Sequence, residues 1–196
     1  MKYDYEFFLR RYKQIESDFL ELTDFIELQS DFNHPSYSVG SSKLIDFCLK
    51  VGTEVETLFR VILESKKFDS VNGIDQKRQN QRMNVYREVI EPKYRLSEYK
   101  LFVNLINKEI QPFENFGSKS LELFRIYSRD KHNKLKLIGK WNLKHSLFSL
   151  GGLLILTINH PSLDGQLFRS HKVSQRVFDS LSLEPRFCGS ISVVID

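Results

Sequence analysis

Apolar side chains recur at alternating spacings of four and three residues between Tyr5 and Leu28. This spacing places them on one stripe of a helix, with acidic residues elsewhere on its surface. The same spacing returns between Leu44 and Ile62. The two stripes consist of Phe8, Tyr12, Ile15, Phe19, Leu22 and Ile26, and of Leu44, Cys48, Val51, Val55, Leu58 and Ile62. Two long helices with matching stripes predict an antiparallel hairpin.

Residues 31–42, which are rich in Asn, Pro, Ser and Gly, separate these helices and predict a connection. Ser41 or Ser42 stands where a cap for the second helix is expected. Glu54 and Glu56 lie near the middle of that helix. Because residues two apart on a helix point in different directions, they are not a ready-made carboxylate pair.

The pattern is less regular in the middle of the chain. Residues 66–82 are polar and predict a mobile connection into a short helix, Met83 to Ile90, which Pro92 ends. Residues 96–116 carry short apolar bursts, which indicate a small extended or β excursion.

Two further helices are predicted in the second half of the chain. The first starts after Gly117, with Ser118 or Ser120 as its cap, and the second starts near Asn142 and is ended by Pro161. One side of the latter is lined by Leu143, Leu147, Leu150, Leu154 and Ile158. The expected fold class is therefore all-α, a helical bundle built on the long antiparallel hairpin.

Gly151 and Gly152 lie inside the last of these helices. Each lowers helix propensity by about 1 kcal/mol relative to Ala, so they predict close approach of a neighbouring helix. Residues 162–196 are Ser-rich and finish in ISVVID, an edge strand or a disordered tail. We expect a helical bundle over residues 1–160 and a C-terminal extension over 161–196, packed on the same domain or partly disordered.

Composition narrows the class of protein. A chain of 196 residues with 41% apolar and 28% charged residues fits one globular domain. The net charge of +4 and pI near 9.0 fit a nucleic-acid partner without requiring one. Cys48 and Cys188 form no Cys-x-x-Cys pair and no secretory leader is evident, which favours the cytoplasm. The apolar run over 147–158 is too short for a membrane span, so no membrane partner is expected.

The most concentrated chemistry lies between Leu121 and Lys144. Five polar residues fall within a few positions of one another, after an apolar run typical of a buried helix face: Arg125, Arg129, Lys131, His132 and Asn133. On a helix, Arg125 and Arg129 precede His132 on roughly the same side. Arginines can hold a phosphodiester while a histidine transfers a proton near neutral pH. The alternative is a solvated basic face.

The lysines that follow leave two interpretations open. Lys134, Lys136, Lys140 and Lys144 either continue a nucleic-acid footprint or form the charged surface of a soluble protein.

No other motif points to chemistry. The chain has no Gly-rich phosphate loop, no His-Glu-x-x-His and no Gly-x-Ser-x-Gly. Its remaining histidines have no acidic or histidine neighbour at ligand spacing, so no metal or cofactor is expected: His34, His145, His160 and His171.

With these residues in hand, the chain resembles the HEPN superfamily of helical bundles, and more closely a set of uncharacterised bacterial HEPN-like proteins. The similarity covers most of residues 5–160. It is carried by three stretches in matching order: YSVGSSKLIDFCLKVGTEVETLF (37–59), IQPFENF (110–116) and LFRIYSRDKHNKL (123–135). The last is similar to that group's Lys-His segment before a Leu-rich helix.

The resemblance implies a metal-independent endoribonuclease that uses the 2′-hydroxyl of RNA as nucleophile. His132 would transfer the proton, and Arg125, which has six residues between it and His132, would hold the phosphate. In that superfamily the residue after the arginine is commonly Asn, Asp or His, whereas here it is Ile126. Two copies usually meet at such sites, which implies a homodimer.

The leading hypothesis is thus an RNA-binding or RNA-cleaving module of bacterial stress or phage defence. His132 and Arg125 are its catalytic pair, and its RNA-binding residues are Arg129, Lys131, Asn133 and Lys134. The alternative is a non-catalytic HEPN-like module that pairs with itself or another protein through aromatic side chains. A third hypothesis, nucleotide transfer or binding, would need an associated nucleotidyltransferase.

Overall fold

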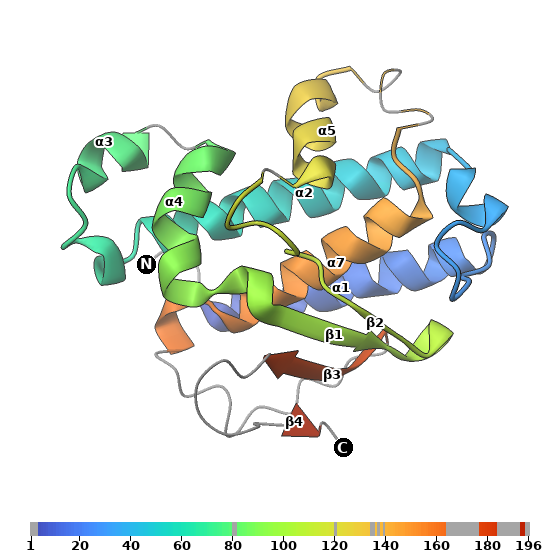
Figure 1. The fold of residues 1–196 in the computed structure, drawn as a ribbon. Helices are drawn as coiled ribbons and strands as arrows, with labels where there is room; N and C mark the ends of the chain where they lie inside the picture. Colours follow the sequence, from blue (N-terminus) through green and yellow to red (C-terminus); the bar gives the residue numbers. More distant parts are fainter. Residues whose placement is uncertain are drawn as a thin grey trace.

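The structure is a computed structural model, and the part of the chain that it describes is mostly helical (Figure 1). This confirms the expected predominance of helix. The described residues are 4–79, 82–119, 121–133, 136, 138, 140–163, 177–183 and 193–194. The helices are α1 (Tyr5–Thr23), α2 (Ser42–Leu63), α3 (Ile74–Gln79), α4 (Met83–Tyr94), α5 (Glu122–Asp130) and α7 (Leu143–Ile158). The strands are β1 (Tyr99–Val103), β2 (Lys108–Ile110), β3 (Phe178–Leu183) and β4 (Val193–Val194).

The long helices α1 and α2 run in opposite directions. Two ion pairs show this direction. Arg11 of α1 pairs with Glu54 of α2 (2.6 Å), whereas Asp18, further along α1, pairs with Lys50, which comes earlier in α2. Helix α7 packs against both, so the core is built from three helices in mutual contact. The correspondence of this arrangement to the HEPN hairpin stays a prediction.

Helix α1 ends sooner than the periodicity predicts. The backbone N–H groups of Phe25 and Ile26 both donate to the carbonyl of Leu22 (3.2 and 3.1 Å), which closes the helix end. The connection to α2 is then anchored by Tyr37, a buried residue whose hydroxyl donates to the carbonyl of Gln29 (2.5 Å). Ser41 caps α2 by accepting the N–H of Leu44 (3.2 Å), as predicted.

Helix α4 continues past the proline that was expected to end it. Pro92 lies in the last turn, where its missing N–H removes a single helical bond. The helix ends instead at Tyr94, because Arg95 adopts a left-handed conformation (φ 49°) and donates its N–H to the carbonyl of Glu91 (2.8 Å). The connection before α4 also contains a short helix, α3, that the sequence analysis did not predict.

An antiparallel sheet covers one side of the helices, with strand order β2-β1-β3-β4. Strands β1 and β2 lie in the predicted 96–116 excursion, whereas β3, the strand that pairs with the other side of β1, was not predicted. The sheet and α5 lie on opposite sides of the long helices (Figure 1).

The C-terminal segment is held to the bundle just before β3. The N–H of Val177 donates to the buried carboxylate of Glu16 on α1 (3.1 Å), and the carbonyl of Val177 accepts the N–H of Asn104 (3.1 Å). Of the ISVVID ending, Val193 and Val194 form β4 at the end of the sheet, and the other four residues lie outside the described part.

Many of the aromatic residues form the interior. The ring of Phe59 on α2 stacks on Tyr86 (5.0 Å between ring centroids) and meets Phe113, Phe116 and Phe124 within 6.1 Å. These contacts join α2, α4, α5 and the segment before α5. None of the described helices combines the length and apolar character that crossing a membrane requires.

Candidate functional site

The charged cluster of the sequence lies on α5 and the turn after it. The helix starts at Glu122, later than expected, and no side chain caps it. Ser118, one of the two predicted caps, instead bonds through its hydroxyl to the carbonyl of Asn115 (3.2 Å). Ser120, the other, lies outside the described residues.

Helix α5 is docked on α2 through Tyr127. Its ring lies against Gly52, where an added Cβ would come within 2.4 Å of a ring carbon. Its hydroxyl is 3.3 Å from Oγ1 of Thr53 and donates to Glu56 (3.4 Å). Burial raises the pKa of Tyr127, so this hydroxyl stays protonated at neutral pH.

Lys131 is tied to α2 by the same contact region. Its ammonium donates to both carboxylate oxygens of Glu56 (2.9 Å each) and lies 5.2 Å from the centroid of the Tyr127 ring. Glu54, two residues before Glu56, bonds Arg11 on α1 instead. The two carboxylates therefore point to different helices, as the sequence predicts.

Arg129 is paired as well. It donates to Asp130 through Nε (3.2 Å) and Nη2 (2.9 Å), and Lys140 donates to the same carboxylate oxygen (3.1 Å). The hydrogen bonds from Arg129 lower the pKa of Asp130 most, and the hydrogen bond from Lys140 lowers it further, against the opposing effect of burial. Asp130 thus joins the end of α5 to the chain that leads into α7.

Arg125 and His132 are left on the outside. Arg125 has a side chain that is 64% exposed and makes one long ion pair, 3.7 Å, with Glu122. His132 is exposed in the turn after α5, and within the described part of the chain it has no hydrogen-bond or ion-pair partner. His132 lies seven positions after Arg125 and beyond the end of α5 at Asp130, so the two residues are not carried by one helix as the sequence analysis expected.

The remaining predicted RNA-binding residues are Asn133 and Lys134. The N–H of Asn133 donates to the carbonyl of Asp130 (2.8 Å) and its side-chain oxygen accepts the N–H of Lys136 (3.4 Å). Lys134 lies outside the described residues. The predicted cluster is therefore divided between cations paired with carboxylates and the more open pair Arg125 and His132.

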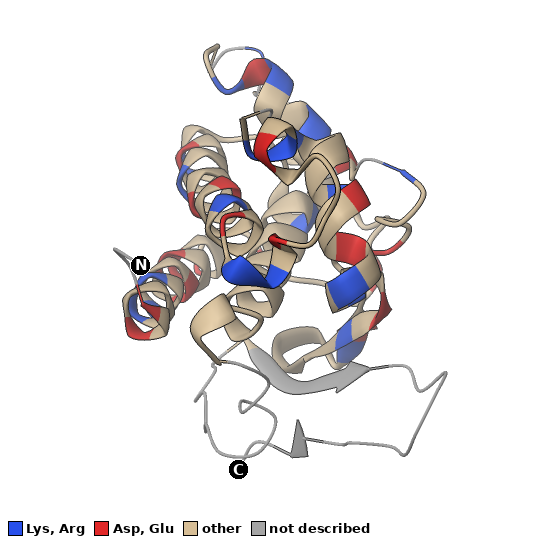
Figure 2. Ribbon diagram, turned by 90° about the vertical axis from the view of Figure 1, so that its left-hand side faces the viewer, with Lys and Arg blue, Asp and Glu red and all other residues tan. Residues whose placement is uncertain are grey.

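On the face shown in Figure 2, neither the basic nor the acidic residues form a separate patch. Lys and Arg alternate with Asp and Glu along the helices there. Nor do the described residues contain a group of three His, Cys, Asp or Glu side chains placed to hold a metal ion.

Neither family models, curated proteins nor solved structures gave a match to this chain. Its function has to be inferred from its own residues.

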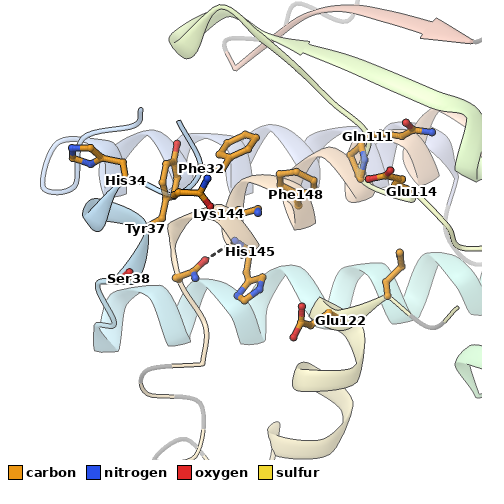
Figure 3. A pocket seen from close by; sticks show the side chains of 14 residues that line it. Phe32, His34, Tyr37, Ser38, Gln111, Glu114, Glu122, Lys144, His145 and Phe148 are labelled. Atoms are coloured by element: carbon orange, nitrogen blue, oxygen red, sulfur yellow. Dashed lines mark hydrogen bonds between the residues drawn. The ribbon is translucent and has the colours of Figure 1, made fainter. Parts of the chain in front are cut away.

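A second feature, a hollow of about 560 Å³, was not predicted from the sequence (Figure 3). It lies between the 24–41 connection, residues 111–122 and the start of α7. Its lining residues are Phe32, Asn33, His34, Tyr37, Ser38, Gln111, Pro112, Glu114, Leu121, Glu122, Asn142, Lys144, His145 and Phe148. The three segments that supply them are separated in sequence, which is why no local pattern reveals the hollow.

Two lysines lie next to the phenylalanine rings that line this hollow. The ammonium of Lys144 is 5.3 Å from the centroid of Phe32 and 5.9 Å from that of Phe148, and Lys108 lies 4.2 Å from Phe32. Burial lowers the pKa of His145, which also lines the hollow, so its imidazole is neutral at neutral pH. Lys144 thus belongs to a different surface from Lys140, its neighbour in the lysine series.

His160 is the most strongly perturbed histidine of the described chain. It is 1% exposed, packs against Phe8 (5.3 Å between ring centroids) and bonds through Nδ1 to the hydroxyl of Ser162 (2.7 Å). Burial lowers its pKa to about 4. Its place in the core identifies it as a structural residue.

Proposed function

We propose that this protein is a HEPN-like module that binds RNA and cleaves it without a metal ion. His132 is the proton-transfer group and Arg125 holds the phosphate. One observation carries the proposal: Arg129 and Lys131 are paired with Asp130 and Glu56, while Arg125 and His132 remain exposed near each other in sequence.

The ion pairs divide the cluster into cations that hold α5 in place and exposed residues that can contact RNA. Paired cations stabilise the docking of α5 and the turn after it, because each carboxylate neutralises the charge that it holds in place. An exposed guanidinium and an exposed imidazole can approach a phosphodiester. Arg129, Lys131, Asn133 and Lys134 then contribute to RNA binding as a secondary, electrostatic surface.

The reaction balances without a cofactor. The 2′-oxygen of the ribose attacks phosphorus, the bond from phosphorus to the 5′-oxygen breaks, and a 2′,3′-cyclic phosphate and a 5′-hydroxyl result. His132 transfers the proton at one of these oxygens, and Arg125 stabilises the charge on the phosphoryl oxygens. The setting that we propose is a homodimer in the bacterial cytoplasm, acting in stress or phage defence.

The test is cleavage of end-labelled mixed-sequence RNA in EDTA, with analysis of the fragment ends. We expect cyclic phosphate ends, and a loss of about a hundredfold in rate for His132→Ala, as is typical when a general acid or base is removed. Arg125→Ala should also lose activity, whereas Arg10→Ala, at an exposed arginine of α1, should not. Equal cleavage by wild type and His132→Ala would sink the proposal.

The alternative, a non-catalytic interaction module, has one observation in its favour. Phe25, two residues beyond the end of α1, is 71% exposed and lies beneath the ammonium of Lys43 (3.8 Å from the ring centroid). An exposed aromatic side chain of this kind is typical of protein interfaces. Under this alternative, Phe25→Ser would disrupt self-association in sedimentation experiments, and charge reversal at Arg125 would have no effect.

A further inference from the structure

We infer that the hollow shown in Figure 3 is a subsite that holds one nucleotide of the RNA strand. Its base packs against Phe32 and Phe148, and its phosphate binds Lys144. This inference rests on the proposed function, which supplies RNA as the partner.

The size of the hollow suits such a ligand. At about 560 Å³ it lies within the range of small-molecule sites. In Figure 3, the rings of Phe32, Tyr37 and Phe148 gather on one side, whereas His145 and Glu122 lie on the other. A planar group can enter between these two sides.

The aromatic side supplies a stacking surface. Phe32 packs edge-on against Tyr37 and Phe148, with ring centroids 5.5 and 5.6 Å apart. Phe32 and Phe148 are only half-buried, so part of each ring remains accessible to a ligand. Aromatic side chains of this kind bind unstacked bases of single-stranded RNA regardless of sequence.

Lys144 supplies the charge that a phosphate needs. Within the described part of the chain, its ammonium has ring contacts but no carboxylate partner. It also lies in the first turn of α7, where a cation is disfavoured by the helix dipole. A bound phosphate would relieve that unfavourable charge.

The hollow also offers hydrogen-bond acceptors for a base. The carboxylates of Glu114 and Glu122 and the amide of Gln111 line it. Amino and imino groups on the edge of a base donate to such acceptors.

Glu122 also connects the hollow to the proposed catalytic pair. Its carboxylate lines the hollow and lies 3.7 Å from Nη2 of Arg125. A nucleotide in the hollow therefore places the adjacent phosphodiester toward Arg125. This is the geometry of a subsite that positions the strand for cleavage.

The experiment measures binding separately from cleavage. The probes are AMP, adenosine, and an oligoadenylate with 2′-O-methyl groups, which has no 2′-hydroxyl to attack phosphorus. Binding is measured by isothermal titration calorimetry with wild type, Lys144→Gln and Phe148→Leu. Lys43→Gln is the matched control, because Lys43 also lies over a phenylalanine ring but outside the hollow.

We expect Lys144→Gln to weaken the binding of AMP about tenfold and to leave adenosine unchanged, because adenosine has no phosphate. Phe148→Leu should weaken both about tenfold through lost stacking. Both variants should weaken the binding of the oligoadenylate, and Lys43→Gln should leave the binding of all three probes unchanged. Circular dichroism melting of each variant verifies that it is folded.

Three results would overturn the subsite: no binding of any probe to wild type, equal binding by wild type and both hollow variants, or binding of AMP without the oligonucleotide. The last would assign the hollow to a free nucleotide. Failure of the nuclease proposal looks different, since His132→Ala would then match wild type in cleavage while the binding pattern of the hollow variants persisted.

Discussion

The ring of Tyr127 on α5 lies directly on the backbone of Gly52 on α2, with no room for a side chain between them. The packing of α5 against α2 depends on this approach, and the proposed catalytic pair is carried by α5 and the turn after it. A glycine in the middle of a helix is otherwise unfavourable. Here its lack of a side chain is what allows α5 to dock.

Gly52→Ala should therefore destabilise the protein. The added methyl group would lie 2.4 Å from the ring of Tyr127, and such overpacking costs about 1–3 kcal/mol in the free energy of unfolding. Urea denaturation monitored by circular dichroism measures it. The matched control is Gly152→Ala on α7, where the nearest ring atom of Phe113 would be 3.5 Å away.

Gly152→Ala should be neutral or stabilise the protein by up to about 1 kcal/mol, through helix propensity alone. The two substitutions thus have opposite expected signs although both add one methyl group to a helical glycine. If Gly52→Ala were as stable as wild type, or if Tyr127→Ala did not remove its effect in a double-mutant cycle, the contact would be unimportant.

The buried imidazole of His160 should make stability depend on pH below neutrality. In the unfolded chain its pKa is about 6.5. Burial lowers the pKa to about 4 in the folded protein, with Lys67 lowering it further and Asp4 opposing the shift. Between these two values the unfolded state binds more protons, so the free energy of unfolding falls as the pH drops from about 6.5 to about 4.

The expected loss across this interval is about 3 kcal/mol. Urea denaturation at a series of pH values measures it, and His160→Leu should flatten the curve in this interval even if it lowers stability at every pH. His132→Ala, which removes an exposed imidazole, is the control and should leave the curve as it is. An unchanged slope in His160→Leu would contradict the assignment.

The ion pair between Glu56 and Lys131 should restrain RNA binding. If Lys131 belongs to the RNA surface, Glu56→Gln releases its ammonium from both carboxylate contacts and removes a negative charge beside it. RNA affinity should then rise a few-fold at low salt, and the slope of log affinity against log salt should steepen by about 0.7. Fluorescence anisotropy with 2′-O-methyl RNA measures both quantities.

Glu88→Gln provides the comparison, because Glu88 makes a similar ion pair with Lys77 (2.7 Å) far from α5 in sequence. It should alter neither affinity nor slope. A Glu56→Gln variant with unchanged RNA affinity would mean that Lys131 serves only to hold α5 on α2.

Periodicity alone predicts the parts of the fold that depend on local pattern. The stripes of α1, α2 and α7, the cap Ser41 and the start of α7 near Asn142 follow from spacing and residue type. That Asn142 also caps α7, by accepting the N–H of His145 (3.0 Å), was not predicted. Strand β3 was missed because its six residues, FDSLSL, carry a weak signal and pair with β1 at a distant point in the sequence.

The charged cluster illustrates the same limit at the level of side chains. Its members could be identified from sequence, but their carboxylate partners could not, since Glu56 lies 75 residues before Lys131. The hollow has no local signature either, because Phe32 and Lys144 meet only through packing. Sequence reasoning therefore finds which groups are available, and tertiary contacts decide which of them remain accessible.

The hydrogen bond between Val177 and Glu16 joins residues that are 161 positions apart, and β1 likewise pairs with β3 from a distant part of the chain. On the ribosome, α1 and the β1–β2 hairpin emerge well before the segment that completes them. Contacts of such long separation slow folding, because the chain must close a large loop before it gains them. The helices can collapse early around α2, whereas the sheet and the buried carboxylate of α1 reach their final partners only late in synthesis.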